Sequence, residues 1–182
     1  LDEISASAHE QVKLQYKYML SILKELENNG IRICRVSKIS EKGRSWLDEY
    51  YREVVYPVLT PMAVDASRPF PFLANRTLNL AVELINQDEE QSMGLVQVPS
   101  VLPRLVEVEG EEKRTFVFLE DVISGNCAEL FKGCQILDVV PFRLTRDSDL
   151  DVDEDDIDNL LKEVEKSLRK RKRGAAVRLE LN

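Results

Sequence analysis

The residues of this sequence that could do chemistry are few, and the first of them is a lone histidine. His9 is the single histidine of the chain, between Ala8 and Glu10. It has no Cys, Asp or Ser partner at a spacing typical of a catalytic or metal-binding pair. We interpret His9 as a residue at the boundary of a helix's apolar stripe, with a chemical role as the alternative.

An acidic stretch from Asp147 to Asp158 holds eight carboxylates in twelve residues. Its opening, Asp147-x-Asp149-x-Asp151, matches the start of a calcium-binding EF-hand loop. Such a loop needs Gly at its sixth position and Glu at its twelfth, and this sequence has Val152 and Asp158 there. Two interpretations stay open, a calcium loop and a solvated loop that caps a helix. We expect the second, and therefore no metal site.

A run of five basic residues, 169–173, is the sharpest cationic feature. Arg169, Arg171 and Arg173 could contact a polyanion such as nucleic acid or a phosphate chain. The alternative is a helix C-terminus at which basic side chains offset the negative end of the dipole. The sequence contains no GxxxxGK[ST] or GxGxxG phosphate loop and no GxSxG nucleophile turn. We therefore expect no catalytic and no cofactor-binding residue in this chain.

Charge and composition exclude several function classes. The net charge is −8, so attraction of the whole surface to nucleic acid or to an anionic membrane is not expected. Cys34, Cys127 and Cys134 form no CxxC pair, which favours a reducing compartment over a disulfide framework. No apolar run is long enough to span a membrane. The sequence opens inside a helical pattern without Met or a signal peptide, and we expect it to be a piece of a longer protein.

Hydrophobic periodicity predicts helices at the start of the chain and a half-buried strand near its middle. Apolar residues spaced by three or four predict a long helix over 4–28, ended by Asn29-Gly30. We expect its N-terminal half to belong to a helical neighbour that is missing from this sequence. A short strand is expected at 31–36, and Ser40 is expected to cap a second helix that ends at Tyr56-Pro57. The proline-rich but apolar segment 56–73 is expected to be irregular, with Tyr56 extended, and to lead into a strand at 78–84.

The rest of the chain predicts antiparallel strands, a short helix and a final helix–strand pair. Strands are expected at 93–98, 105–109, 115–119 and 135–146, with a helix over 120–131. Asp153 begins a strongly amphipathic helix, and residues 175–181 form a last strand with Val177, Leu179 and Leu181 inward. The predicted fold class is α+β: a long N-terminal helix, then helices packed on a largely antiparallel sheet.

The sequence contains several long distinctive stretches: VYPVLTPMAVDASRPFPFLANRTLNLAV, VPSVLPR, FVFLEDVI, the Leu130-Phe131-x-Gly133 turn and FRLTRDSDLDVDEDDIDNLLKEVEKSLRKRKRGAAVRLEL. Together, these stretches resemble bacterial polyphosphate kinase. That family has an N-terminal helical domain, a head domain and two C-terminal catalytic domains. The resemblance implies that residues 1–29 are the last helix of the helical domain. Residues 30–182 would then be a head domain, incomplete at its C-terminal end.

The resemblance also implies an activity for the parent enzyme. The family transfers the terminal phosphate of ATP, with Mg²⁺, to an active-site histidine and then to polyphosphate. No position of this sequence matches the family's catalytic motifs, so the fragment alone is expected to be inactive and to bind neither cofactor. Its expected partners are the missing N- and C-terminal domains and a second subunit, joined as a homodimer through the head domain. A cytoplasmic parent is expected, with attachment to the membrane periphery left open. The alternative function is a free-standing anion-binding or protein-interaction module that uses the basic run 169–173.

Overall fold

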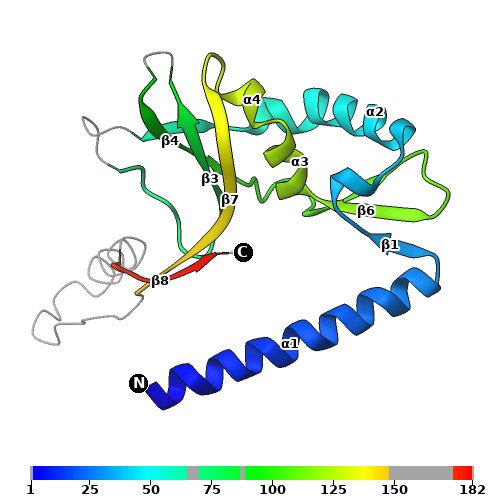
Figure 1. Cartoon of the computed structure of the whole chain (residues 1–182), viewed down its shortest axis with the longest axis horizontal. Helices are drawn as coiled ribbons and strands as arrows, with labels where there is room; N and C mark the ends of the chain where they lie inside the picture. The colour runs from blue at the N-terminus through cyan, green and yellow to red at the C-terminus, as the bar shows by residue number, and fades with distance from the viewer. Residues whose placement is uncertain (1, 65–69, 87–88, 148–173, 182) are drawn as a thin grey trace, which may run out of the picture. The chain divides into compact units, whose positions relative to one another are not determined.

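The protein is described by a computed structural model, which covers residues 2–64, 70–86, 89–147 and 174–181. The chain divides into two compact units. Unit 1 contains Leu1–Pro57 and Val101–Val122, and unit 2 contains Val58–Ser100 and Ile123–Asn182. The predicted α+β class is confirmed, and its strands are distributed over two sheets (Figure 1). The domain boundary expected after residue 29 stays a prediction.

Unit 1 holds the three-stranded sheet, in the order β1-β6-β5. Its elements are α1 (Asp2–Asn28), β1 (Ile31–Ile33), α2 (Glu41–Tyr50), β5 (Leu105–Val108) and β6 (Arg114–Phe118). The hairpin β5–β6 is antiparallel as expected, but β1 pairs with β6 in parallel. The helix α3 (Leu119–Gly125) follows β6 directly and carries the chain into unit 2.

The long helix α1 forms as predicted and ends where Gly30 takes a positive φ of 83°. Among its described residues none is buried, and the helix contacts β1. Large apolar side chains on it, including Ile4, Tyr18 and Leu20, are more than 60% exposed. Of the predicted apolar stripe, Ile4, Tyr16 and Met19 are 71%, 53% and 43% exposed, whereas Leu23 and Leu26 are half-buried. The helical neighbour to which the N-terminal half was expected to belong stays a prediction.

Ser40 caps α2 as predicted, because its Oγ accepts the backbone N–H of Gly43 at 3.0 Å. The chain then continues through a π-helical turn (Tyr51–Val55) and a 3₁₀ turn (Tyr56–Val58). The prediction that Tyr56 is extended is wrong, since its φ and ψ are −52° and −44°. Pro57 has no backbone N–H, but in the first turn of a helical segment this group would have no intrahelical acceptor. The 3₁₀ turn therefore accommodates Pro57.

Unit 2 holds an antiparallel five-stranded sheet in the order β2-β4-β3-β7-β8. Its elements are β2 (Pro61–Val64), β3 (Leu78–Ile85), β4 (Gln91–Gln97), α4 (Cys127–Leu130), β7 (Gln135–Arg146) and β8 (Ala176–Leu181). The strand β2 lies inside the segment that we expected to be irregular. It begins with Pro61 at the edge of the sheet, where a missing ladder donor is tolerated.

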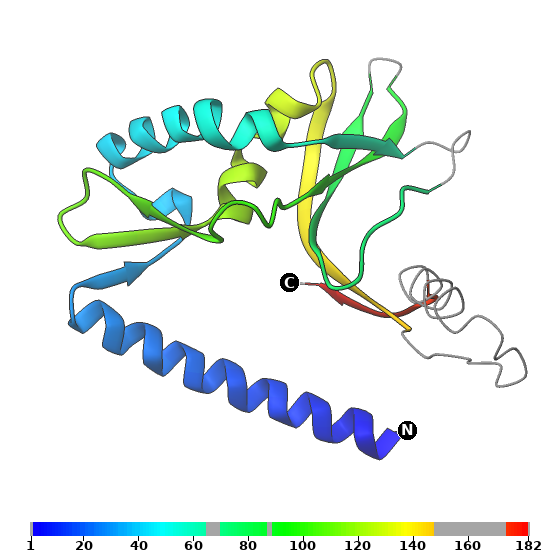
Figure 2. The same cartoon turned by 180° about the vertical axis from the view of Figure 1, so that it is seen from behind.

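The two faces of this sheet are covered differently. Leu80, Val82 and Leu84 point to one face and are buried, as the alternation in β3 predicts. Gly94 allows close packing, because a Cβ at this position would come within 2.5 Å of the Phe131 ring. Figure 2 shows α4 beside the start of β7, in agreement with the contacts between these elements. The opposite face carries a smaller core cluster of Leu73, Leu95 and Phe142.

Two further expectations are corrected. The single helix expected over 120–131 is two helices, because Asn126 leaves the helical region with φ −115° and ψ 11°. Val177, Leu179 and Leu181 were expected to point inward, but they are 56–67% exposed. Their strand, β8, is at the edge of the sheet, and no described segment covers these side chains. The amphipathic helix expected from Asp153 lies outside the described residues.

Candidate functional site

The residues that the sequence singled out for polyanion binding are not placed by the structure. Arg169, Arg171 and Arg173 lie outside the described residues, and so does the acidic stretch beyond Asp147. Among the residues that are described, no group of three or more His, Cys, Asp or Glu side chains could hold a metal ion. Neither the polyanion contact nor the calcium loop is tested.

His9 lies on the exposed surface of α1. Its Nδ1 is 2.7 Å from the backbone carbonyl oxygen of Ser5 and 3.5 Å from the Ser5 hydroxyl, one helical turn away. The charged neighbours on the same helix, Lys13 and Glu10, pair with each other at 2.7 Å. The contact with Ser5 orients the His9 ring toward the helix backbone. The interpretation of His9 as a residue at the boundary of the apolar stripe stays a prediction.

The cysteines are free thiols. Burial raises the pKa of Cys127 to about 11, so its reactive thiolate form is disfavoured at neutral pH. Burial also raises the pKa of Cys34. Cys127 lies against the backbone of α3, with Sγ 3.4 Å from the carbonyl oxygen of Ile123. Its role is packing.

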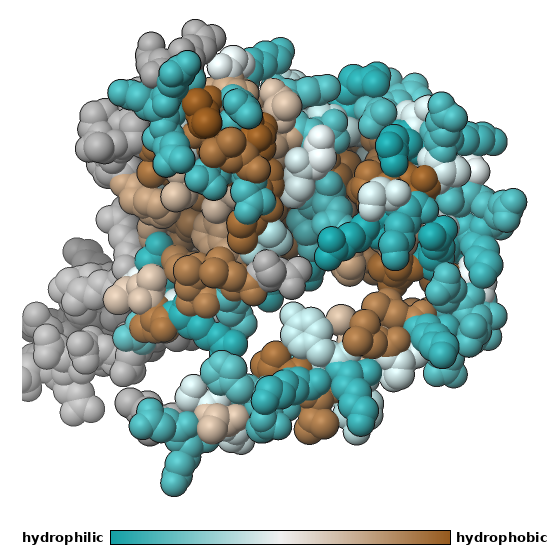
Figure 3. Space-filling model, viewed as in Figure 1, coloured by the Kyte–Doolittle hydropathy of each residue, from teal (hydrophilic) through white to brown (hydrophobic). Residues whose placement is uncertain are grey.

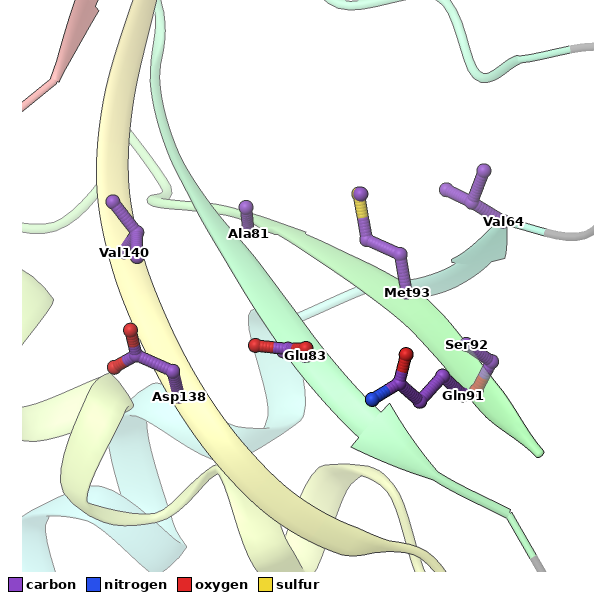
Figure 4. A pocket seen from close by; sticks show the side chains of 8 residues that line it. All are labelled: Val64, Ala81, Glu83, Gln91, Ser92, Met93, Asp138 and Val140. Carbon is purple, nitrogen blue, oxygen red and sulfur yellow. The ribbon is translucent and has the colours of Figure 1, made fainter. Parts of the chain in front are cut away.

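A recess of about 460 Å³ lies on the less covered face of the five-stranded sheet (Figure 4). Its apolar lining comes from Val64, Ala81, Met93 and Val140 on four neighbouring strands. Strand alternation explains this set, since residues two apart on a strand share a face and register pairs lie side by side. Met93 remains 44% exposed, although its neighbours across the strands are apolar.

Two carboxylates stand at one end of the recess. Glu83 on β3 and Asp138 on β7 are direct register partners, and Figure 4 shows their side chains next to each other. The Oδ1 atom of Asp138 accepts the backbone N–H of Val139 at 2.8 Å. The pairing of β3 with β7 becomes irregular directly after Glu83. Leu84 pairs with Ile136, so Leu137 has no register partner on β3. A β-bulge therefore begins beside the acidic pair.

The other end of the same face is closed by the segment that enters β3. Leu73 packs on Leu95 and Phe142, and Val64 and Ala81 contact this cluster. Arg146 ties the segment down, because its Nε donates to the Leu73 carbonyl at 2.9 Å and its guanidinium lies over the Phe72 ring at 4.7 Å. The recess is thus an apolar depression, closed at one end and acidic at the other.

The charge of the recess decides what it can do chemically. Its described lining includes Glu83 and Asp138 and no Lys or Arg side chain, so it disfavours phosphate and other anions. Sequence reasoning placed Glu83 on the polar face of its strand but did not find the site. The missing information was the register of β3 against β7, which brings Asp138 opposite Glu83.

A second recess, in unit 1, has mixed charge. It measures about 470 Å³ and is lined by Arg32, Lys42 and Lys113 together with Glu27, Glu111 and Glu112. Glu111 is already engaged, since its Oε1 accepts the backbone N–H of Ser40 at 2.7 Å. Hydrogen bonding to Ser40 is the main cause that lowers the pKa of the Glu111 carboxyl, and the positive charge of Arg32 lowers it further. Cations and carboxylates alternate here, so the recess has no single preferred ligand charge.

Comparison with known proteins identifies the family. A family model described as the polyphosphate kinase middle domain matches residues 42–182. The chain belongs to the polyphosphate kinase family. The resemblance seen in the sequence is therefore confirmed.

Individual polyphosphate kinases agree with this assignment. The polyphosphate kinase of Halalkalibacterium halodurans is 46% identical over 185 residues, which cover 100% of this chain and 26% of that protein. The polyphosphate kinase of Aphanizomenon baltica is 40% identical and is matched over 50% of its length. The crystal structure of polyphosphate kinase from Porphyromonas gingivalis has a TM-score of 0.71 and 29% identity, over 79% of this chain and 25% of that one. The chain thus spans about a quarter of the length of most of these polyphosphate kinases.

Within the described parts of the chain, no helix combines the length and apolar character needed to cross a bilayer.

Proposed function

We propose that this chain is the non-catalytic head domain of a polyphosphate kinase, and that it holds other domains and a second subunit in place. The parent enzyme would transfer the terminal phosphate of ATP to polyphosphate with Mg²⁺, through a phosphohistidine supplied by another domain. The match to the middle domain, together with the short share of each relative that the chain spans, supports this assignment of roles.

The observation that carries the scaffolding role is the uncovered apolar face of β8. Val177, Leu179 and Leu181 are 62%, 56% and 67% exposed on one edge strand of unit 2. Figure 3 shows hydrophobic surface, in brown, over the strands of unit 2 and on α1. Apolar surface exposed in a contiguous patch marks a place where another protein surface packs. An edge strand adds unpaired backbone donors and acceptors to that attraction.

The exposed face of β8 suits a second copy of this chain. An isologous contact uses the same patch on both subunits, so an apolar strand edge is self-complementary. We therefore propose a homodimer through unit 2, with the missing domains of each parent chain arranged around it. A cytoplasmic location for the parent belongs to the same proposal.

Sedimentation velocity at tens of micromolar tests this function. The wild-type chain is expected to sediment as a dimer. Leu179→Lys is expected to give monomers, because it places a charge in the centre of the apolar strand face. Ala128→Lys, which adds the same charge at an exposed position on α4, is the control and should remain dimeric. A wild-type chain that is monomeric throughout the concentration range would overturn the proposed dimer.

A further inference from the structure

We propose that the recess on the five-stranded sheet is a docking site for a basic amphipathic polypeptide segment. The segment would insert apolar side chains between Val64, Ala81, Met93 and Val140, and would place a Lys or Arg against Glu83 and Asp138. The proposal rests on the scaffolding role above and names the chemistry of one partner. It concerns unit 2 alone.

Two like charges oppose each other at one end of the recess. Glu83 and Asp138 are register partners on adjacent antiparallel strands. Partners in such a pair have Cα atoms roughly 4.5–5.5 Å apart, and like charges at these positions destabilise a sheet. A cation held between the two carboxylates removes this repulsion. The pair is therefore a site at which binding a Lys or Arg has an added favourable contribution.

A β-bulge lies beside this acidic pair. The register shift after Glu83 leaves Leu137 without a partner on β3, and Leu137 is 42% exposed. Bulges bend a strand and re-aim side chains, and they are over-represented next to binding and active sites. Here the bulge interrupts the ladder at the open, acidic end of the recess, where an incoming segment would enter.

The floor of the recess is apolar and has a small residue at its centre. Ala81 is small and lies between the longer side chains of Met93 and Val140, which leaves room for a side chain from a partner. Met93 has an unbranched, flexible thioether, the kind of side chain that adapts to different apolar partners. An apolar floor with a charged rim is the arrangement that amphipathic helices recognise in grooves.

The negative charge of Glu83 and Asp138 favours a basic segment over the other possible occupants of the recess. A phosphate group would be repelled by both carboxylates. A second copy that docked symmetrically through this recess would bring another acidic pair against the first. Two carboxylates also fall short of the six or more oxygen ligands that Ca²⁺ takes. A Lys or Arg next to apolar side chains complements every feature of the recess.

The test uses the full chain and a synthetic peptide as the probe. The peptide has about fourteen residues, roughly four helical turns, with Leu on one face and Lys on both flanks. The control peptide has Glu in place of each Lys. Binding is measured by fluorescence anisotropy at low ionic strength. The ε-methyl resonances of the chain's three methionines are followed by NMR, with Met93→Ile used to assign the signal of Met93.

The decisive variant is Glu83→Gln combined with Asp138→Asn. Both changes preserve shape, and Asn keeps the oxygen that accepts the Val139 N–H. Removing the like-charge pair should not unfold the sheet, and a melt checks that the double variant is folded. The matched control is Glu53→Gln combined with Glu129→Gln, which removes the same charge from two exposed positions elsewhere.

The proposal predicts that the Lys peptide binds the wild-type chain and shifts the Met93 methyl signal, while the Met19 signal stays in place. Affinity for the Glu83→Gln/Asp138→Asn variant should fall at least about ten-fold, and the matched control should bind like wild type. Equal binding to both double variants, or equal binding of the Glu peptide, would overturn it. A recess filled by a second copy would appear as a dimer that the Lys peptide dissociates by competition, and this too would overturn it. Loss of the dimer in Leu179→Lys with peptide binding intact would separate the two proposals.

Discussion

Glu111 joins the β5–β6 hairpin to the start of α2, because its carboxylate accepts the backbone N–H of Ser40 at 2.7 Å. The side-chain and backbone hydrogen bonds with Ser40 lower the pKa of Glu111 below its ordinary value of 4.5. A carboxyl group whose pKa is lower in the folded state adds stability above its unfolded pKa. That stability is lost as the pH falls through the lowered folded value.

Glu111→Gln should therefore make the stability of the chain less dependent on pH at acidic pH. The amide oxygen can still accept the Ser40 N–H, but it carries no charge and does not titrate. Thermal unfolding between neutral pH and pH values below 4.5 should show a smaller loss of Tm on acidification in Glu111→Gln than in wild type. The exposed Glu53→Gln serves as control, and a control that reduces the loss of Tm equally would contradict this assignment.

Gly94 is needed where β4 passes under the Phe131 ring. A Cβ at this position would lie 2.4 Å from the ring, closer than packing allows. We expect Gly94→Ala to lower the free energy of unfolding by about 1–3 kcal/mol, measured by urea denaturation. In a Phe131→Leu background the cost of Gly94→Ala should be smaller. Gly125→Ala is the control, because a Cβ there meets no atom within 4 Å, and an equal cost at both glycines would refute the packing argument.

At the scale of elements, strand position within the sheet decides how much a side chain contributes. Leu80 on the central strand β3 is fully buried, whereas Leu179 on the edge strand β8 is 56% exposed. Leu80→Ala should cost about 2–5 kcal/mol of unfolding free energy. Leu179→Ala should change it by less than about 0.5 kcal/mol at concentrations where the chain is monomeric. Equal costs in urea melts would mean that β8 is covered.

The elements that could be predicted are those with a strong local pattern. The expected strand at 135–146 coincides with β7, and β3 ends one residue beyond its expected end, because alternation and turn residues mark both. The parallel pairing of β1 with β6 could not be predicted, since β1 has only three residues and its partner is far away in sequence. The strand β2 was hidden by the prolines around it.

The recess could not be predicted from the sequence, for a related reason. Glu83 and Asp138 belong to different strands, and only the register of those strands brings them together. A shift of one residue would have placed Asp138 on the opposite face. Periodicity shows which residues share a face of one strand, but it carries no information about partners on another.

At the scale of the whole molecule, the chain combines a net charge of −8 with exposed apolar side chains on α1 and β8. Its charge disfavours association with polyanions over the whole surface, whereas its apolar side chains favour packing against protein. The relatives in the polyphosphate kinase family are longer proteins, and this chain spans about a quarter of the length of most of them. We propose that this chain supports catalysis by other parts of the full-length enzyme and performs none itself.

Incubation with radiolabelled ATP and Mg²⁺ tests whether this chain captures a phosphoryl group. Phosphoryl capture by histidine needs a positioned ring and cations that neutralise the transferring phosphate. His9 is instead held at 2.7 Å from the Ser5 carbonyl on an exposed helix surface. A full-length polyphosphate kinase, treated in parallel, should acquire acid-labile, base-stable label, and this chain should acquire none. Label of that kind on this chain, abolished by His9→Ala, would contradict the account.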